Sequence, residues 1–415
     1  MPAQAGPKEA LIMADRLKIA AVINEYRPRA HGQHIVDRFL DGYGWNGRWH
    51  RPEMDLVSLY VDQSGESDLS RERETRFPQL TIYPTVADTL TLGGSSLAVD
   101  GVLLIGEHGT YGQNEKGQHL YPRYELFKQI VAVFRASGRA VPVFNDKHLS
   151  WKWEWAKEMF DISREMGFAF MAGSSLPVTH RIPAIEMPLG ANVGEAMVVA
   201  VGAMDSYDIH ALEAMQCMVE RRNGGESGVK WLKAYSDDEF WEAHESGLWS
   251  RELFNAILCR ATRLNSARPG FNHIFPTTDD LKKMVLDPES NFKKGKTFAY
   301  HYEHNDGLKC TMIMLNGVVQ EFTVAVQIEG RDDPWAVSMY LPINECLADF
   351  FNPLTNNIEK MFLTGKPTYP VERTLLCSGL VCAGVDSIFA EGARQETPHL
   401  NIAYQPTAES TFWRD

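Results

Sequence analysis

The feature that most constrains the fold is a regular alternation of short apolar runs and helix-patterned segments between residues 18 and 172. Runs typical of strands buried on both faces stand at 18–23, 55–61, 81–83, 100–105, 140–144 and 167–172. Segments with helical spacing of apolar residues lie at 33–40, 86–90, 124–136 and 151–166. This alternation predicts an α/β domain with a doubly wound, Rossmann-like parallel sheet.

The rhythm changes after about residue 182. Further strands are predicted at 196–201, 297–302, 309–316 and 323–328, and helices at 211–221, 358–363 and 373–393. Asn305-Asp306-Gly307 and Asn316-Gly317 supply turn signals between consecutive strands. A second, α+β domain with a large, mainly antiparallel sheet is therefore expected. The segments at 44–53, 109–122 and 223–250 are predicted to be inserted loops, which in compact domains are often functional.

The length of 415 residues exceeds what one ordinary core accommodates, so two domains are expected. We predict an N-terminal extension at 1–16, a Rossmann-like nucleotide-binding domain at 17–181, and a substrate or oligomerisation domain at 182–415. The final helical segment is a candidate to pack back on the first domain. An open face of the second sheet would need a cover, which predicts a homo-oligomer.

Composition limits the classes of partner. A net charge of −13 argues against binding to nucleic acid or to an anionic membrane, because both need a basic face. The first residues lack the pattern of a secretory signal, and no run approaches the ~20 apolar residues of a membrane span, so a cytoplasmic protein is expected. Buried thiols in a reducing compartment are expected for the six cysteines, which are Cys217, Cys259, Cys310, Cys346, Cys377 and Cys382.

Three segments carry a family resemblance. Residues 141–172, VPVFNDKHLSWKWEWAKEMFDISREMGFAFMA, read as strand, polar motif, helix and strand. This block resembles the Gfo/Idh/MocA family of oxidoreductases, with Asp146-Lys147-His148 where that family has Glu-Lys-Pro. Residues 202–212, GAMDSYDIHAL, are similar to the family's Asp and His helix start, and residues 367–393 are similar to its closing helix.

The resemblance implies NAD(P)-dependent hydride transfer on a sugar, polyol or related hydroxylated small molecule. It implies that Lys147 and His210 handle the hydroxyl proton and that Asp205 or Asp208 orients the imidazole. The spacing leaves open which aspartate does so, because Asp205 lies five and Asp208 two residues before His210. A capping role for Asp205 at the following helix is the structural alternative.

The phosphate loop departs from the family. Residues 24–32, NEYRPRAHG, contain one glycine, whereas a GxGxxG fingerprint needs three for the tight turn and the approach to a pyrophosphate. Two arginine side chains in this loop are candidates to bind phosphate instead. The predicted site for NAD or NADP comprises Asn24, Arg27, Arg29, His31, Asp62, Glu107, His108 and Asn145, with Asp62 placed to bind a ribose hydroxyl.

The altered loop leaves other functions open. A divalent metal is the alternative to a nucleotide, with candidate ligands His31, His34, Glu107, His108 and His148. The HxxH of His31 and His34 is more often a polar helix start than a metal motif. A lyase, hydrolase or isomerase acting on a sugar-like substrate, or a sensor without catalysis, are the alternatives to an oxidoreductase.

Overall fold

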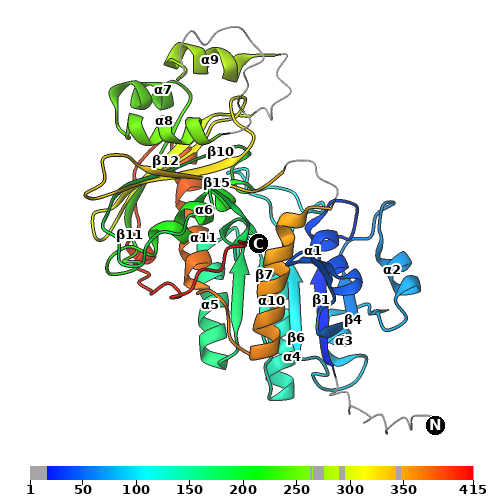
Figure 1. Ribbon diagram of the computed structural model, residues 1–415. Helices are drawn as coiled ribbons and strands as arrows, with labels where there is room; N and C mark the ends of the chain where they lie inside the picture. The colour runs from blue at the N-terminus through cyan, green and yellow to red at the C-terminus, as the bar shows by residue number, and fades with distance from the viewer. Residues whose placement is uncertain (1–15, 262–263, 265–274, 289–294, 343–346, 415) are drawn as a thin grey trace, which may run out of the picture.

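The computed structural model describes residues 16–261, 264, 275–288, 295–342 and 347–414. The chain forms two lobes, each built on one large sheet (Figure 1). The N-terminal sheet and its helices make the lower lobe of this view, and the second sheet with its helices makes the upper lobe.

The N-terminal sheet has six strands in the order β5-β4-β1-β6-β7-β8, and all neighbouring pairs are parallel. In that order the strands are Thr81–Ile82, Met54–Val61, Leu17–Ile23, Gly101–Ile105, Val143–Asp146 and Phe170–Gly173. The strand order reverses beside β1, with β4 and β5 on one side of it and β6, β7 and β8 on the other. Doubly wound folds bind their ligands at such a reversal. The predicted Rossmann-like sheet is confirmed.

Helices cover both faces of this sheet because residues 19–23 of β1 and 101–105 of β6, its central strands, are buried and apolar on both faces. On one face lie α3 (Val86–Thr91), α4 (Arg123–Ser137) and α5 (Trp153–Met166). On the other face lie α1 (His31–Asp41) and α10 (Asn352–Thr364). The short helix α2 (Ser70–Arg76) lies at the outer edge (Figure 1).

Helix α10 comes from the last sixth of the chain but belongs to the N-terminal core. Its side chains Leu354, Ile358 and Phe362 pack in one cluster with Ile19 of β1. The Phe362 ring lies so close to Gly101 that a Cβ there would be 2.9 Å from it. The chain therefore returns to the first sheet after building the second.

The second sheet has eight strands in the order β16-β11-β12-β13-β10-β14-β15-β9 and is mainly antiparallel, as predicted, with β10 and β13 parallel. In that order the strands are Gln395–Glu396, Val229–Ser236, Phe298–His304, Lys309–Met314, Val193–Ala200, Phe322–Ile328, Trp335–Met339 and Arg181–Ile182. The turn at Asn316-Gly317 connects β13 to β14, but these two strands are not adjacent in the sheet, because β10 lies between them.

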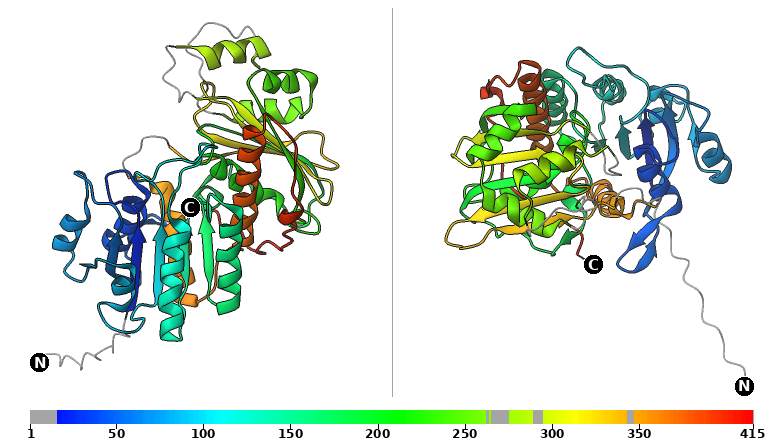
Figure 2. Two further views of the ribbon diagram at one scale, coloured as in Figure 1. Left: turned by 180° about the vertical axis from the view of Figure 1, so that it is seen from behind. Right: turned by 90° about the horizontal axis from the view of Figure 1, so that it is seen from above.

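Both faces of the second sheet are covered by helices of the same chain. Alternate residues of each strand point to opposite faces, so Val198 faces α6 (Asp208–Val219) and α11 (Glu372–Phe389). Met197 instead faces α7 (Asp237–Ser246), α8 (Arg251–Arg260) and α9 (Thr278–Leu286). Figure 2 shows the two helical layers on either side of the strands.

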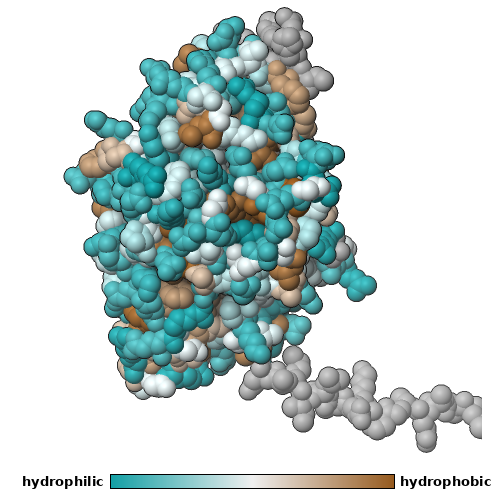
Figure 3. Space-filling model, turned by 90° about the vertical axis from the view of Figure 1, so that its left-hand side faces the viewer, coloured by the Kyte–Doolittle hydropathy of each residue, from teal (hydrophilic) through white to brown (hydrophobic). Residues whose placement is uncertain are grey.

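This cover removes the reason given above for a homo-oligomer, since the sheet face is not open. The surface view in Figure 3 shows a mainly hydrophilic face on which hydrophobic residues form small separate groups. An oligomer through some other surface stays a prediction.

Several predicted boundaries were wrong. The strand predicted at 140–144 is β7, which runs from Val143 to Asp146, and the helix predicted from 211 begins at Asp208. The segment 223–250 is not an inserted loop, because it holds strand β11 and helix α7. The segment 44–53 contains a small hairpin of β2 (Tyr43–Trp45) and β3 (Arg48–His50).

The remaining expectations concern thiols and membranes. Four of the five described cysteines are buried, but Cys259 is exposed, and all five are free thiols. Cys346 lies outside the described residues. Among the described residues, no helix combines the length and the apolar character needed to cross a bilayer.

Candidate functional site

Seven of the residues predicted from the sequence meet in a cavity of about 660 Å³ where the two lobes face each other. They are Arg29, His31, His34, Glu107, His108, Lys147 and His210. The ends of β6 and β7 and the start of α1 supply most of them, which is the expected address of a ligand in an open α/β sheet. The start of α6 contributes His210, and residues just before α10 close one wall.

Backbone strain is concentrated at this cavity. Arg29, His108, Lys147 and Ala348 line it and have φ values of 66°, 70°, 63° and 45°. Asp205, whose carboxylate approaches the cavity-lining ring of His119, has φ 62°. Side chains other than glycine rarely occupy this left-handed region, and such strain tends to gather where function requires it. The strained backbone and the polar side chains therefore indicate the same cavity as the functional site.

A buried ion pair fixes the position of Lys147. Its Nζ lies 3.1 Å from Glu107 Oε1 and donates to the Ser206 carbonyl at 2.9 Å. The other oxygen of Glu107 accepts from the buried guanidinium of Arg123. Burial raises the pKa of Glu107, but the charges of Lys147 and Arg123 outweigh burial and hold it well below its usual range. The carboxylate is therefore ionised and anchors the ammonium beside the cavity.

A second buried carboxylate, Asp205, ties loop 109–122 to the start of α6. Its Oδ2 accepts from the backbone N–H of His119 at 2.7 Å, and the ring nitrogen His119 Nδ1 is 3.8 Å away. The nearby Asp205 carboxylate raises the pKa of His119. His148, named above as a candidate metal ligand, places Nε2 3.9 Å from Asp205 Oδ1 and 3.2 Å from Arg123 Nη1.

His210 pairs with a hydroxyl rather than with an aspartate. Its Nδ1 lies 2.6 Å from Ser174 Oγ. Asp208 Oδ2 instead accepts from the Asp205 backbone N–H at 3.0 Å and from the Tyr300 hydroxyl at 3.2 Å. Burial and the charge of Lys147 hold the pKa of His210 well below its usual range, so the imidazole is neutral near pH 7.

Asp208 is protonated more readily than an ordinary aspartate. Burial, followed by the neighbouring charge of Asp205, raises the pKa of Asp208 to about 7. The resemblance implied that Asp205 or Asp208 orients His210, but neither carboxylate is hydrogen-bonded to the His210 ring. The two aspartates shape the turn that begins α6.

His31 forms the carboxylate pair that the sequence did not reveal. Its Nδ1 lies 2.7 Å from Oδ2 of Asp146, which ends β7, 115 residues away. The Asp146 side chain is 1% exposed, whereas that of His31 is 14% exposed and lines the cavity. The rings of His108 and Phe351 flank the imidazole, with centroids 5.3 and 5.1 Å away.

Two predicted cofactor ligands build turns instead of lining the cavity. Asn24 is buried and its Nδ2 donates to the His108 carbonyl at 3.2 Å. Asn145 is buried as well, and its Nδ2 lies within 3.2–3.4 Å of the carbonyl oxygens of Asp146, Lys147 and His148. These contacts stabilise the strained backbone that follows β6 and β7.

Loop 109–122 contacts the end of β4, where Asp62 is exposed. The Asp62 carboxylate accepts from the Tyr60 hydroxyl and from the Tyr111 hydroxyl, each at 2.7 Å. Burial and hydrogen bonding to Asp62 raise the pKa of both phenols, to about 12 for Tyr60. The neighbouring Gln63 side chain bonds both the N–H and the carbonyl of Thr110. Asp62 and Arg27, which pairs with Glu25, lie outside the cavity lining.

The proposed metal ligands do not form a metal site. Within the described residues, no group of three or more His, Cys, Asp or Glu side chains is arranged to hold a metal ion. His31 and His34 share one helix, but His31 bonds Asp146 and His34 stacks on Phe351. Burial lowers the pKa of His34 to about 4 and that of His108 to about 3, so both are neutral.

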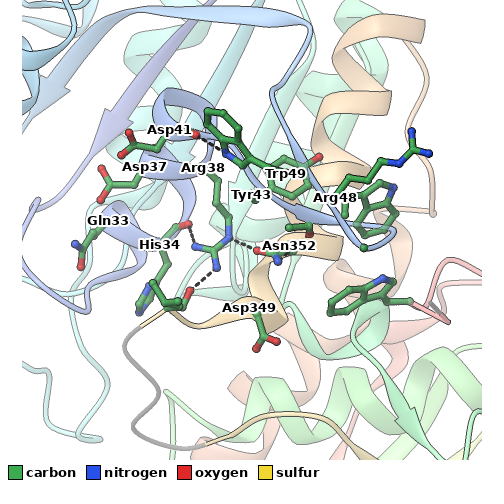
Figure 4. A pocket seen from close by; sticks show the side chains of 16 residues that line it. Gln33, His34, Asp37, Arg38, Asp41, Tyr43, Arg48, Trp49, Asp349 and Asn352 are labelled. Carbon is green, nitrogen blue, oxygen red and sulfur yellow. Dashed lines mark hydrogen bonds between the residues drawn. The ribbon is translucent and has the colours of Figure 1, made fainter.

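A second cavity, of about 700 Å³, shares His34 with the first (Figure 4). The side chains that line it hold the segment before α10 in place. Arg38 reaches across it from α1. Its guanidinium donates to Asn352 Oδ1 at 2.8 Å and to the carbonyl oxygens of Leu347 and Ala348, each at 2.6 Å. These bonds fasten the segment that carries Ala348 and Phe351 into the candidate site.

Sequence reasoning missed Asp146 as the partner of His31, Arg123 as a partner of Glu107, and the loop residues His119 and Tyr111. Asp146 had a usable signal, since it adjoins Lys147 at the end of a buried strand. Arg123 had a weaker one, being a charged residue at the start of an amphipathic helix. Tyr111 and His119 lie in a segment predicted to be functional but without assigned residues.

Comparison with known proteins adds the family context. No protein-family model matches this chain, and no curated protein matches its sequence. Solved structures do match its fold over most of the chain. The fold is that of the Gfo/Idh/MocA oxidoreductases.

Three structures illustrate this likeness. GenD2 from gentamicin A biosynthesis, in complex with NAD, is 13% identical with a TM-score of 0.55, covering 95% of this chain and 99% of GenD2. Myo-inositol dehydrogenase from Lactobacillus casei, with NAD(H) and myo-inositol, is 12% identical with a TM-score of 0.54, covering 94% and 99%. A Gfo/Idh/MocA family oxidoreductase from Vibrio cholerae is 13% identical with a TM-score of 0.51, covering 90% and 99%.

The Gfo/Idh/MocA fold contains a Rossmann sheet, and such sheets bind dinucleotides. The pyrophosphate lies at the N-terminus of the first helix, and a ribose hydroxyl bonds an acidic residue after the second strand. Gly32 meets one requirement, because a Cβ there would be 2.6 Å from the Glu25 carbonyl and would separate helix from loop. Asp62 is exposed after β4, but each of its oxygens already accepts from a tyrosine hydroxyl, so a ribose hydroxyl would have to use the remaining lone pairs. In this conformation the residues present meet the requirements of a dinucleotide only in part.

Proposed function

We propose that the chain is an enzyme of the oxidoreductase kind that acts on a polyhydroxylated small molecule, a sugar or a polyol, bound in the cavity between the lobes. The observation that carries this proposal is the convergence of Lys147, His31 and His210 on one cavity at the carboxyl ends of the strands. An ammonium group and imidazoles are suited to bind hydroxyl groups and to move their protons.

The chain's own residues supply the binding and the proton-transfer chemistry. The Lys147 ammonium, fixed by Glu107 and Ser206, stabilises negative charge that develops on a substrate oxygen. His210, neutral and held by Ser174, is placed to hydrogen-bond a hydroxyl of the same substrate. Phe322, Phe350 and Phe351 line the same cavity and reduce the access of water.

Oxidation of an alcohol also requires a hydride acceptor. GenD2 and the Lactobacillus casei enzyme contain NAD, which makes a nicotinamide nucleotide the first choice here as well. Because the Tyr111 hydroxyl is bonded to Asp62, we propose that a nucleotide binds more tightly once residues 109–122 move away from the end of β4. NAD and NADP are both open as choices.

A second candidate function uses the same cavity without redox chemistry. The single glycine of residues 24–32 and the tyrosine bonds of Asp62 favour it, since both weaken nucleotide binding, while Lys147, His31 and His210 can exchange protons without a nucleotide. In that case the protein is a lyase or an isomerase of a sugar-like compound.

Nucleotide binding separates the two candidates. The native protein and Tyr111→Phe are titrated with NAD and NADP in a calorimeter, with Tyr60→Phe as the control. Tyr60 also bonds Asp62 but comes from β4 itself. The redox proposal expects binding that tightens at least tenfold in Tyr111→Phe, and nucleotide reduction when inositols are added. Absence of binding at millimolar nucleotide in all three proteins excludes the redox proposal, and conversion of the same compounds without nucleotide then establishes the second candidate.

A further inference from the structure

We infer that His31 is the catalytic acid–base residue of this site and that Asp146 is its positioning residue. This inference rests on the proposed function, because it assigns the residue that exchanges a proton with the hydroxylated substrate. It adds a pair of side chains that the family resemblance did not indicate.

The geometry of the pair specifies which ring nitrogen is free. A carboxylate only accepts hydrogen bonds, so His31 Nδ1, 2.7 Å from Asp146 Oδ2, carries the hydrogen. In the neutral ring Nε2 then bears the lone pair. Because Nδ1 is used by a side chain that is 1% exposed, Nε2 is the nitrogen left for a ligand in the cavity that His31 lines. A carboxylate in this position fixes the tautomer and stabilises the imidazolium formed on protonation.

The other imidazoles of the cavity are less suited to take a proton. Burial lowers the pKa of His34 to about 4 and of His108 to about 3, and holds that of His210 well below its usual range. His119 has a carboxylate neighbour in Asp205, but its Nε2 is 2.9 Å from the Gln113 side chain. His31 therefore combines a carboxylate partner with a free Nε2.

The contact with His31 pairs the buried carboxylate of Asp146. Among the described residues, its other oxygen, Oδ1, is buried and has no hydrogen-bond partner. A buried carboxylate is costly unless it is paired, and the pair with His31 joins the end of β7 to the first residue of α1. The neighbouring Lys147 ammonium is directed to Glu107 and Ser206.

In the proposed step one proton moves from a substrate hydroxyl to His31. The substrate O–H bond breaks, its electron pair stays on the oxygen beside the Lys147 ammonium, and the proton forms an N–H bond at His31 Nε2. The imidazolium is then balanced by the Asp146 carboxylate. In the reverse direction His31 returns the proton to the oxygen.

A spectroscopic measurement tests the pair without a substrate. Long-range proton–nitrogen NMR on protein labelled in histidine is expected to show the Nδ1–H tautomer at His31 in the native chain and a shift toward the Nε2–H tautomer in Asp146→Ala. His50 is the internal control, because its Nε2 lies 2.8 Å from Glu359 outside the cavity. Glu359→Gln changes the His50 signals and leaves those of His31 unchanged. An Nε2–H tautomer in the native protein overturns the inference.

Turnover tests the catalytic role. On an inositol that the native protein converts, His31→Gln is expected to lower kcat at least 100-fold, the usual contribution of a general acid–base group. Asp146→Asn lowers kcat with little change in KM, and His50→Gln leaves both unchanged. Normal kcat in His31→Gln overturns the inference. Failure of the native protein to convert any inositol or sugar counts against the proposed function, whereas the tautomer measurement still decides the pair.

Discussion

At the scale of single residues, Glu213 of α6 shows how burial sets a protonation state. Its Oε2 accepts from the Ser174 N–H, and its Oε1 lies 2.6 Å from Thr374 Oγ. That hydroxyl is also 2.9 Å from the Ala172 carbonyl. One hydroxyl hydrogen cannot serve two acceptors, so a protonated Glu213 that donates to Thr374 satisfies all three groups. Burial raises the pKa of Glu213 to about 7, in agreement.

Glu213→Gln is therefore expected to stabilise the protein above pH 7 and to be nearly neutral near pH 4. The raised pKa means that the folded state retains a proton that the unfolded state loses, so stability from this residue is full below about pH 4.5 and is lost as pH rises from there to about 7. The difference reaches on the order of 3 kcal/mol by linkage. Urea unfolding of both proteins between pH 4 and pH 8 measures it, and parallel curves at all pH values contradict it.

The residues of the candidate site were predictable where local sequence decides their position. Glu107, His108 and Lys147 follow apolar strands, and strand ends of a parallel sheet meet at one edge. The contact of His31 with Asp146 spans 115 residues, so no local pattern contains it. The occupation of Asp62 by Tyr111 was equally hidden, because it depends on the path of a loop without helix or strand.

At the scale of elements, the exit of β8 requires a glycine. Gly173 has φ 118°, and a Cβ there would be 2.5 Å from Glu213 Oε1 and 2.7 Å from Thr374 Oγ. The strand therefore ends against the buried side chains of Glu213, in the middle of α6, and Thr374, at the start of α11. No side chain fits between them.

Gly173→Ala is expected to destabilise the protein by about 3 kcal/mol, because strain and steric overlap add at this position. The matched control is Gly138→Ala at the end of α4, where φ is also positive, at 61°, but no atom lies within 4 Å of the added Cβ. It should cost about 1 kcal/mol. Thermal unfolding of the two variants compares them, and equal losses would show that packing at Gly173 is unimportant.

Elements with strong periodicity were predicted, and those that depend on tertiary contacts were not. The central strands β1 and β6 are apolar throughout because both of their faces are buried, which makes them visible in sequence. Strand β11 alternates exposed and buried residues in a segment rich in glycine and charge, and it was read as a loop. Its pairing with β12 determines its conformation.

At the scale of the whole molecule, Arg38 couples the two halves of the sequence. Its guanidinium on α1 holds Leu347, Ala348 and Asn352, more than 300 residues later, and these precede or begin α10. Since Ala348 and Phe351 line the candidate site, Arg38 helps to fix the shape of the cavity.

Arg38→Lys is expected to increase hydrogen exchange in residues 347–352 at least tenfold while leaving strand β12 unchanged. A lysine retains the charge but cannot reach the several acceptors that the planar guanidinium contacts. Exchange followed by mass spectrometry resolves the two segments. Unchanged protection at 347–352 would mean that packing of α10, and not Arg38, holds the wall.

The late position of α10 has a consequence for synthesis of the protein. Leu354, Ile358 and Phe362 complete one side of the core around β1, although β1 itself ends at Ile23. While the chain emerges from the ribosome, only α1 covers that side of the first sheet until residues 352–364 have been made. The N-terminal lobe therefore cannot mature ahead of the C-terminal one, and an excised fragment ending at residue 181 would expose an apolar surface.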